Sequence, residues 1–324
     1  MVRWGIVPVA FLSIVLAACA AAQEQTDAIM PVPLFPAEPE RVELDGLRYL
    51  GGLEIELADD RFGGLSALEV SADGSRILAL SDSAWWVTAT LDWSEAGQLA
   101  GLRDLDIQPV LGPDGQHLEG RSGDSEGLSP MRDGRYAVSF ERNHRILAYD
   151  LGEDWSRAGS ALPEVLPAPP GAEDLPDNRG MEALATVGPR RLIAGVEYPL
   201  RLDLRHDLWE EMRNGWRRLD LVLDPGFGLT GMSSHAGQLY VLTRFYSSDT
   251  GNRIVIRRVA EPVLARPRPA RPDRLATLGP EHSVDNFEGI AAFTREGQTI
   301  LLIVSDDNYS PRQRTLLMAF MVER

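Results

Sequence analysis

Short runs of apolar residues, some alternating with polar ones, dominate the chain after residue 40. Leu53-Glu54-Ile55-Glu56-Leu57 alternates at period two, which is typical of a strand with one buried face. Leu301-Leu302-Ile303-Val304 is fully apolar and follows a glycine-containing turn, as expected of a strand buried on both faces. Helical spacing is rare, and residues 207–213 are where a single short helix is expected. The pattern predicts an all-β domain.

One unit of this pattern recurs five times. Each copy has a polar, glycine-containing start, a first apolar strand, a tight turn and a second apolar strand that ends in polar residues. The first strands start within residues 62–66, 124–129, 178–184, 226–232 and 285–291. The second strands lie within residues 77–82, 136–142, 192–197, 239–244 and 301–308. The copies recur at roughly 50–60 residues, somewhat longer than the repeat of a four-stranded propeller blade.

This repeat predicts a single β-propeller of five or six blades joined by extended loops. Five copies are countable, and a sixth, degenerate blade could lie in the long first interval. After the fifth copy only residues 315–322 remain for a further strand, so we expect residues 53–57 to complete the last blade. Such pairing of the N- and C-terminal strands closes the ring and leaves no free edge.

The N-terminus has the features of an export signal. Arg3 precedes an apolar stretch at residues 6–18, which is too short to span a bilayer comfortably but suits a signal-peptide core. Leu16-Ala17-Ala18-Cys19 resembles the lipobox of bacterial lipoproteins, in which the cysteine is lipidated after cleavage; the alternative is an ordinary signal cleaved near residues 20–22. Since residue 20 is Ala, the resemblance implies a periplasmic protein anchored to the outer membrane. We expect a signal over 1–22, a proline-rich tether over 23–40 and the propeller over 41–324.

Charge and cysteine content narrow the partners. The formal net charge is -16 and the pI is about 4.8, which argues against nucleic acid because phosphate backbones require a basic surface. A cation, or an anionic ligand brought with its cation, fits better, although acidity also serves solubility. Cys19 is the only cysteine, so no intramolecular disulfide can form. We expect a monomer that meets the membrane through its lipid anchor only.

Repeated carboxylates are the main chemical signal. The first strand of each propeller blade lines the central channel, so residues repeated at its start form a ring at one mouth. Glu126, Glu182 and Glu288 are expected to lie together there. The ends of the second strands should add Asp82, Glu141, Glu197, Asp306 and Asp307 to these three glutamates as metal ligands. Clustered carboxylates either take up protons or bind a cation, and oxygen ligands suit Ca²⁺ before Mg²⁺.

Arginines occupy equivalent or adjoining positions in the repeat, at Arg142, Arg179 and Arg244. Arginine pairs with carboxylate or phosphate in bidentate geometry, so two interpretations stay open. Cations and arginines together could hold an anionic, phosphorylated ligand over the channel, or the glutamates and arginines could simply tie neighbouring blades together. No serine lies in a Gly-x-Ser-x-Gly turn, so a hydrolase triad has no support.

Several of these motifs in combination resemble the phytase-like family, also described as having esterase-like activity of phytase. They are Phe62-Gly63-Gly64-Leu65-Ser66, Asp124-Ser125-Glu126-Gly127, Asn178-Arg179-Gly180-Met181-Glu182, Leu223-Asp224-Pro225-Gly226-Phe227-Gly228-Leu229-Thr230, Asp285-Asn286-Phe287-Glu288-Gly289 and Ser305-Asp306-Asp307-Asn308. The resemblance spans about residues 45–322. It implies a β-propeller related to calcium-dependent phytases that hydrolyse phosphoesters.

Under this interpretation the glutamates hold calcium that activates water, and the arginines stabilise the charge of the transition state. The catalytic residues would be Glu126, Glu182, Glu288, Arg142, Arg179 and Arg244. All 32 basic residues are arginine, so any phosphate site must be built from arginine and metal. The alternative is a propeller of the cell envelope that binds a ligand or forms a scaffold without catalysis.

Overall fold

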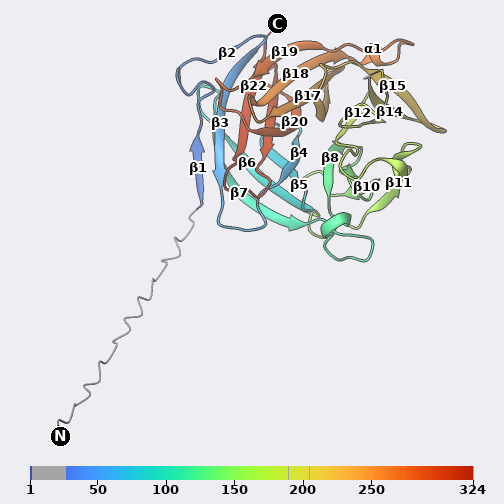
Figure 1. Ribbon diagram of the computed structural model, residues 1–324, viewed down its shortest axis with the longest axis horizontal. Helices are drawn as coiled ribbons and strands as arrows, with labels where there is room; N and C mark the ends of the chain where they lie inside the picture. Colours follow the sequence, from blue (N-terminus) through green and yellow to red (C-terminus); the bar gives the residue numbers. More distant parts are fainter. Residues whose placement is uncertain (2–26, 189, 204, 324) are drawn as a thin grey trace.

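The computed structural model describes residue 1 and residues 27–188, 190–203 and 205–323. Five antiparallel sheets stand around a central axis as the blades of a β-propeller (Figure 1). The predicted signal sequence, Cys19 and most of the predicted tether lie outside the described residues. The prediction of an all-β propeller is confirmed, with five blades among the described residues.

Each blade runs from an inner strand at the axis to an outer strand at the rim. Blade 1 contains β4 (Leu65–Val70), β5 (Arg76–Ser81), β6 (Trp85–Trp93) and β7 (Leu99–Pro109), and blade 2 contains β8 (Ser125–Pro130), β9 (Arg135–Phe140), β10 (Arg145–Asp150) and β11 (Glu164–Leu166). Blade 3 contains β12 (Ala183–Val187), β13 (Arg191–Gly195), β14 (His206–Met212) and β15 (Gly215–Leu221), and blade 4 contains β16 (Gly228–His235), β17 (Gln238–Ser247), β18 (Gly251–Ala260) and β19 (Asp273–Leu278).

Blade 5 joins the two ends of the chain. Its own strands are β20 (Asn286–Arg295), β21 (Gln298–Asp306) and β22 (Thr315–Val322), and the N-terminal β3 (Leu47–Glu56) pairs with β22 in antiparallel register. The predicted closure by residues 53–57 is therefore confirmed, with a longer strand than expected. Figure 1 shows β3 and β22 side by side.

Part of the segment predicted as a tether belongs to the folded domain. The strand β1 (Ala28–Pro31) pairs with β3, and the short β2 (Glu43–Leu44) pairs with its other end. Leu34 and Phe35 are buried in the core of blades 4 and 5. The proline content of this stretch indicated a linker, but its few apolar residues are enough to bind it to the sheet.

Two further expectations are corrected. Residues 207–213 were expected to be helical, but β14 covers nearly all of them and pairs with β13 and β15. The first interval holds no sixth blade among the described residues; its length comes from the long strands β6 and β7 and the loop at 110–124. The helices found in residues 27–323, apart from the undescribed 189 and 204, are the four-residue α1 (Glu261–Leu264) and two 3₁₀ turns, η1 (Gly120–Ser122) and η2 (Ala172–Asp174). Within the described part of the chain, no helix has the length and hydropathy needed to cross a bilayer.

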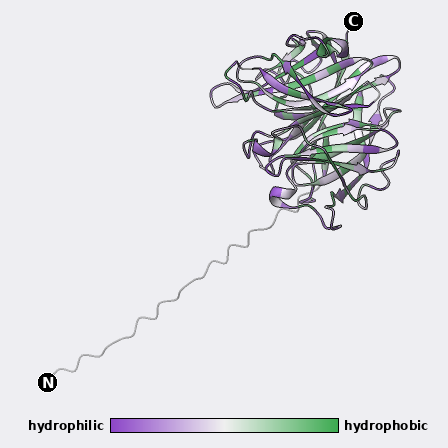
Figure 2. Cartoon of the chain, turned by 90° about the vertical axis from the view of Figure 1, so that its right-hand side faces the viewer, coloured by the Kyte–Doolittle hydropathy of each residue, from purple (hydrophilic) through white to green (hydrophobic). Residues whose placement is uncertain are grey.

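Apolar side chains fill the spaces between neighbouring blades. The clusters join strands of adjacent sheets, for example Leu147 of blade 2 with Leu80 of blade 1. In Figure 2 the hydrophobic colouring follows the strands inside the molecule, and the hydrophilic colouring follows the loops. Strands buried on both faces explain the continuous apolar runs in the sequence.

Small residues let the five inner strands meet at the axis. A Cβ atom on Gly127 would lie 2.5 Å from Ser139 Oγ, and one on Gly231 would lie 2.6 Å from the backbone oxygen of Glu288. The space left along the axis is about 10 Å³, roughly that of one water molecule. The channel is therefore packed along its axis.

Candidate functional site at the channel mouth

The side chain at the start of each inner strand is placed by a break in the strand register. The ladder skips a residue between Leu229 and Gly231 in β16 and between Phe287 and Gly289 in β20, with equivalent breaks in β4 and β8. A bulge of this kind re-aims the extra side chain. The re-aimed residues are Ser66, Glu126, Thr230 and Glu288, and Glu182 precedes the first residue of β12 in the remaining blade.

This register also corrects the alignment of the first repeat. The first strands were expected to start within residues 62–66 and 124–129, but Ser66-Ala67-Leu68, which extends past residue 66, occupies the place of Glu126-Gly127-Leu128 at the axis. The motif Phe62-Gly63-Gly64 therefore lies one step further out, against Asp82 and Tyr309. Glycine residues are visible in the sequence and suggested where each first strand begins. The bulge in β4, which sets the true alignment with β8, is not visible in the sequence.

The ends of the second strands form an outer ring around the first. Asp82, Glu141 and Glu197 each donate a backbone N–H to the backbone oxygen of the matching inner segment, at Gly64, Asp124 and Gly180. Asp306 pairs with Asn286 and Arg244 pairs with Gly228 at the same level of blades 5 and 4. The mouth therefore gathers seven of the predicted carboxylates around one arginine of the ring: Asp82, Glu126, Glu141, Glu182, Glu197, Glu288 and Asp306.

Three acidic side chains of blade 2 come close enough to share one ion. Ligand oxygens of Asp124, Glu126 and Glu141 all lie within 4.8 Å of one another. Glu141 Oε1 accepts a hydrogen bond from the Gly180 N–H at 2.8 Å. Asp124 Oδ2 is buried and lacks a hydrogen-bond partner among the described residues, although Arg142 Nε forms an ion pair with it at 2.8 Å. Asp124 Oδ2 therefore accepts no hydrogen bond of good geometry within the described residues, and it could serve as a ligand for a cation.

Burial raises the pKa of every carboxyl group in the two rings. Burial is the largest cause for each, and neighbouring carboxylates add to it; the pKa rises to about 6 for Asp82, to about 7 for Glu197 and Glu288, and to about 9 for Asp306. The pKa values of Glu126 and Glu182 rise well above the usual range for the same two reasons. These groups repel one another when ionised, so the mouth favours protons or a cation.

Arg244 is the guanidinium that, among the described residues, forms ion pairs with carboxylates of the two rings. Its Nη2 lies 3.3 Å from Glu288 Oε1 and 3.8 Å from Glu197 Oε1. Its Nε is buried and has no hydrogen-bond partner among the described atoms. The same Glu288 oxygen accepts a hydrogen bond from Asn286 Nδ2 at 3.0 Å, and that amide also reaches Asp306 Oδ2 at 3.1 Å.

The structure separates three predicted site residues from the centre of the mouth. Asp307 Oδ1 accepts hydrogen bonds from the N–H groups of Gly64 and Tyr309, and its Oδ2 accepts one from Thr315. The strand β21 ends at Asp306, so Asp307 lies in the loop that follows. Its carboxylate holds that loop in place through these hydrogen bonds. Arg142 lies at the rim in its ion pair with Asp124. Arg179 is exposed, and its guanidinium lies 5.9 Å from the centre of the Tyr198 ring.

A groove of about 680 Å³ opens from the mouth between blades 4 and 5. Arg244 and Glu288 form its inner end, and Arg312 lines it further out. The remaining walls are mainly amide and hydroxyl groups, from Asn252, Asn286, Asn308, Gln313, Ser310 and the exposed Tyr246. The groove thus joins the acidic mouth to solvent through a polar, arginine-containing surface.

Sequence reasoning missed Asp124, Asn286 and Arg312 as members of the site. Asp124 lies two residues before Glu126, and a polar residue two positions before a repeated glutamate was an available signal. Asn286 relates to Glu288 in the same way. Arg312 lies in the loop between β21 and β22, where no repeat marks it.

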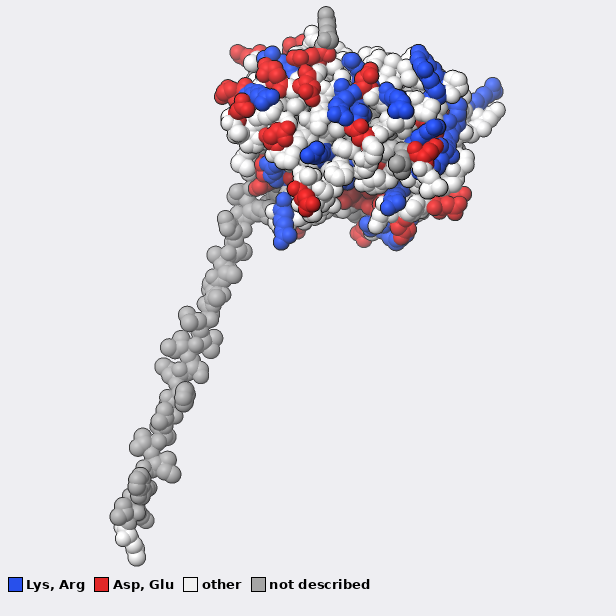
Figure 3. All heavy atoms as spheres, turned by 45° about the horizontal axis from the view of Figure 1, so that its top comes forward, with Lys and Arg blue, Asp and Glu red and all other residues white. Residues whose placement is uncertain are grey.

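The molecular surface carries mixed charge. Figure 3 shows arginine side chains beside acidic ones on the face in view, with no continuous basic surface there.

Comparison with known proteins identifies the family. Residues 60–309 match the phytase-like family, described as "Esterase-like activity of phytase". The chain belongs to this family. The resemblance inferred from the sequence motifs is thereby confirmed, and the matched residues contain all of blades 1 to 4 and the strands β20 and β21 of blade 5.

Solved structures that resemble this phytase-like propeller have low sequence identity to it. A β-xylosidase, RS223, is 14% identical, with a TM-score of 0.47, over 85% of this chain and 94% of that one. The WD40 repeats of RRP9 are 12% identical, with a TM-score of 0.44, over 87% and 100% of the two chains. An α-L-arabinanase mutant of Cellvibrio cellulosa is 10% identical, with a TM-score of 0.47, over 79% and 90%. No curated protein matches the chain.

Proposed function

We propose that this phytase-like propeller is a calcium-dependent phosphoester hydrolase whose site is the acidic channel mouth. The observation that carries the proposal is the imbalance of charge there. Seven buried or half-buried carboxylates share the mouth, and among the described residues only Arg244 forms ion pairs with any of them, with Glu288 and Glu197. Burial and mutual repulsion raise the pKa values of all seven. A ring that served only to tie blades together would pair each acid with a base.

The donor set fits a hard divalent cation. Asp124, Glu126 and Glu141 offer only oxygen atoms, and no His or Cys belongs to the cluster. Calcium accepts many oxygen ligands in flexible geometry, which suits a ring of carboxylates better than magnesium does. When bound, such an ion supplies a water of lowered pKa and neutralises a phosphoryl group. Glu182 and Glu288 lie near enough to this cluster to influence its charge.

The groove between blades 4 and 5 provides a place for the substrate. Arg244 lines the inner end, where a phosphoryl oxygen would pair with its guanidinium. Arg312 would hold a further anionic group of the substrate. The amides of Asn252, Asn308 and Gln313 would hydrogen-bond the alcohol part, so the substrate class is a small phosphorylated molecule with polar substituents.

Glu288 is the best-placed general base. It reaches both the groove and the carboxylate ring, and its pKa of about 7 allows it to take a proton from an attacking water near neutral pH. Arg244 and Asn286 fix its Oε1, so the orientation of the carboxyl group is set before the substrate arrives. Arg244 would then stabilise the charge that develops on the phosphoryl oxygens.

The cellular setting remains part of the proposal. The features of residues 1–22 favour export and lipidation at Cys19, which would anchor the protein to the outer membrane facing the periplasm. Because β1 already pairs with β3 at Ala28, only a short arm would join such an anchor to the propeller. The propeller would then act close to the membrane surface.

A thermal melt of the mature domain with calcium and with EDTA, followed by a p-nitrophenyl phosphate assay on the same samples, tests the proposal. We expect calcium to raise the melting temperature, because a ligand of the folded state adds RT ln(1 + [L]/Kd) to stability, and to switch on turnover. A rise in melting temperature without turnover on any phosphoester would support a binding propeller instead. The absence of both effects would contradict a metal site.

A further inference from the structure

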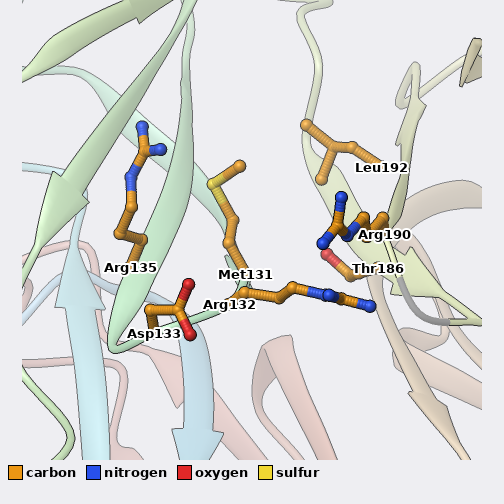
Figure 4. A pocket seen from close by; sticks show the side chains of 7 residues that line it. All are labelled: Met131, Arg132, Asp133, Arg135, Thr186, Arg190 and Leu192. Atoms are coloured by element: carbon orange, nitrogen blue, oxygen red, sulfur yellow. The ribbon is translucent and has the colours of Figure 1, made fainter. Parts of the chain in front are cut away.

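A second pocket lies between blades 2 and 3, away from the acidic mouth. Its volume is about 190 Å³, and the turn before β9 and the hairpin of β12 and β13 form its two sides (Figure 4). Figure 4 shows Arg132 and Arg190 extended into the space between these two sides. The lining residues are Met131, Arg132, Asp133, Arg135, Thr186, Arg190 and Leu192.

The pocket is far from the proposed active site. Glu126 is at the mouth end of β8, and Met131 follows the last residue of that strand. Five residues of extended chain at about 3.3 Å each separate them by roughly 16 Å. A molecule in this pocket therefore touches neither the carboxylate rings nor the groove between blades 4 and 5.

The base of the pocket is apolar. Leu192 belongs to a buried hydrophobic cluster with Ile146 and Leu184, and Met131 packs against that cluster. The hydroxyl of Thr186 is already hydrogen-bonded to Ser129 Oγ at 2.9 Å. The inner surface therefore favours a hydrocarbon group over a polar one.

The rim of the pocket is positively charged. Arg135 is paired with Glu164, whereas Arg190 makes no ion pair with the acidic residues that the structure describes. Asp133 is the one acidic residue in the lining. In a protein of net charge -16, arginines gathered over an apolar base mark a place where a negative group gains from pairing.

We propose that this pocket binds a small amphipathic carboxylate, with its hydrocarbon body on Met131 and Leu192 and its carboxylate against Arg190 and Arg132. The volume sets the size of the body, since an apolar cavity of about 150 Å³ accommodates benzene. Benzoate and carboxylates of similar size are the matching class. Planar, bidentate pairing with a guanidinium is the contact that distinguishes the acid from its neutral analogue.

Calorimetric titration of the mature protein with benzoate, in EDTA so that no cation occupies the mouth, tests the site. For a ligand of this size we expect saturable binding with a Kd on the order of 1 mM. Arg190→Gln should raise the Kd about tenfold or more, and benzyl alcohol should bind at least about tenfold more weakly than benzoate. The matched control is Arg312→Gln, which removes an arginine from the groove and should leave the Kd unchanged.

A substitution of opposite effect guards against misfolding as the cause of any loss. Asp133 has a φ of 57°, which asparagine tolerates, so Asp133→Asn should fold and should lower the Kd by removing the single negative charge of the rim. Benzoate binding that Arg190→Gln leaves unchanged, or that Arg312→Gln abolishes, would overturn the assignment. Lack of saturation at concentrations about tenfold above the expected Kd would also overturn it.

Discussion

Two acidic clusters of this propeller differ in how their charge is compensated. On the outer strands of blade 3, Asp207 lies between Arg201 and Arg218 at 3.1 and 2.7 Å, and Asp220 lies 2.6 Å from Arg201 and 3.1 Å from Arg205. The channel mouth holds seven carboxylates, of which only Glu288 and Glu197 lie within ion-pair distance of Arg244.

The difference shows where the acidic residues serve structure and where they do not. The arginines around Asp220 lower its pKa despite partial burial, whereas the pKa of Glu288, at about 7, stays raised even though Arg244 is beside it. Arginine–carboxylate pairing as structural glue is thus present on blade 3. The mouth lacks enough arginine for the same role, which supports a cation site there.

The comparison predicts its largest effect in catalysis. Glu126→Gln removes a charged oxygen from the Asp124–Glu126–Glu141 cluster, so we expect turnover of p-nitrophenyl phosphate in calcium to fall about 100-fold or more. Asp220→Asn removes one negative charge from the paired cluster of blade 3 and should leave turnover within about twofold of the original. Equal turnover in the protein and in Glu126→Gln would place the chemistry elsewhere.

The next largest effect is a loss of stability when the close packing of the inner strands at the axis is disturbed. Gly231→Ala places a Cβ atom 2.6 Å from the backbone oxygen of Glu288, and such overpacking costs about 1–3 kcal/mol. The matched control is Gly101→Ala on the outer strand β7, where a Cβ atom meets only Asp92 atoms at 3.8 Å. Urea unfolding curves measure both variants. A tolerated Gly231→Ala would mean that the inner strands do not meet as tightly as described.

The fold could be predicted from the sequence because the same unit of apolar strands and glycine-containing turns occurs five times. The closure by β3 followed from the strand missing after residue 322. The bulges that aim Glu126 and Glu288 into the mouth were not accessible, because a bulge is a shift of register between two strands and leaves no fixed residue type. Residues 207–213 were wrongly predicted as a helix. The alternation of apolar and polar residues in β14 is interrupted at Trp209-Glu210-Glu211, and such a sequence also suits a short helix.

The pH dependence of calcium binding sharpens the contrast between the two clusters. An acid with a raised folded pKa contributes stability that is present below about pH 4 and lost as pH rises through the folded value. The metal-free protein should therefore lose stability between pH 4 and 9, since the pKa values are about 6 for Asp82, about 7 for Glu288 and about 9 for Asp306.

Calcium competes with these protons, so its stabilising effect should grow over the same range, by about 1.4 kcal/mol per pH unit for each proton displaced. Thermal melts at pH 5, 7 and 8.5, with calcium and with EDTA, measure this. A calcium-induced shift in melting temperature that does not change with pH would show that the mouth carboxylates are not the ligands.

The smallest expected effect is on the free energy of unfolding, and its sign differs between the channel mouth and the paired cluster of blade 3. Without calcium at pH 8, Glu182→Gln relieves repulsion among buried carboxylates and should raise the free energy of unfolding by roughly 1 kcal/mol. Asp220→Asn breaks favourable pairs and should lower it by about 0.5–1 kcal/mol. Urea unfolding in EDTA compares the two. A loss of stability in Glu182→Gln would indicate that the mouth acids are paired after all.

Calorimetric titration of EDTA-stripped protein with calcium at pH 8 measures directly whether the carboxylates of the channel mouth bind a cation. We expect saturable binding that Glu126→Gln weakens at least about tenfold and Asp220→Asn leaves unchanged. Absence of saturable binding, or equal binding by the protein and Glu126→Gln, would contradict a calcium site at the channel mouth.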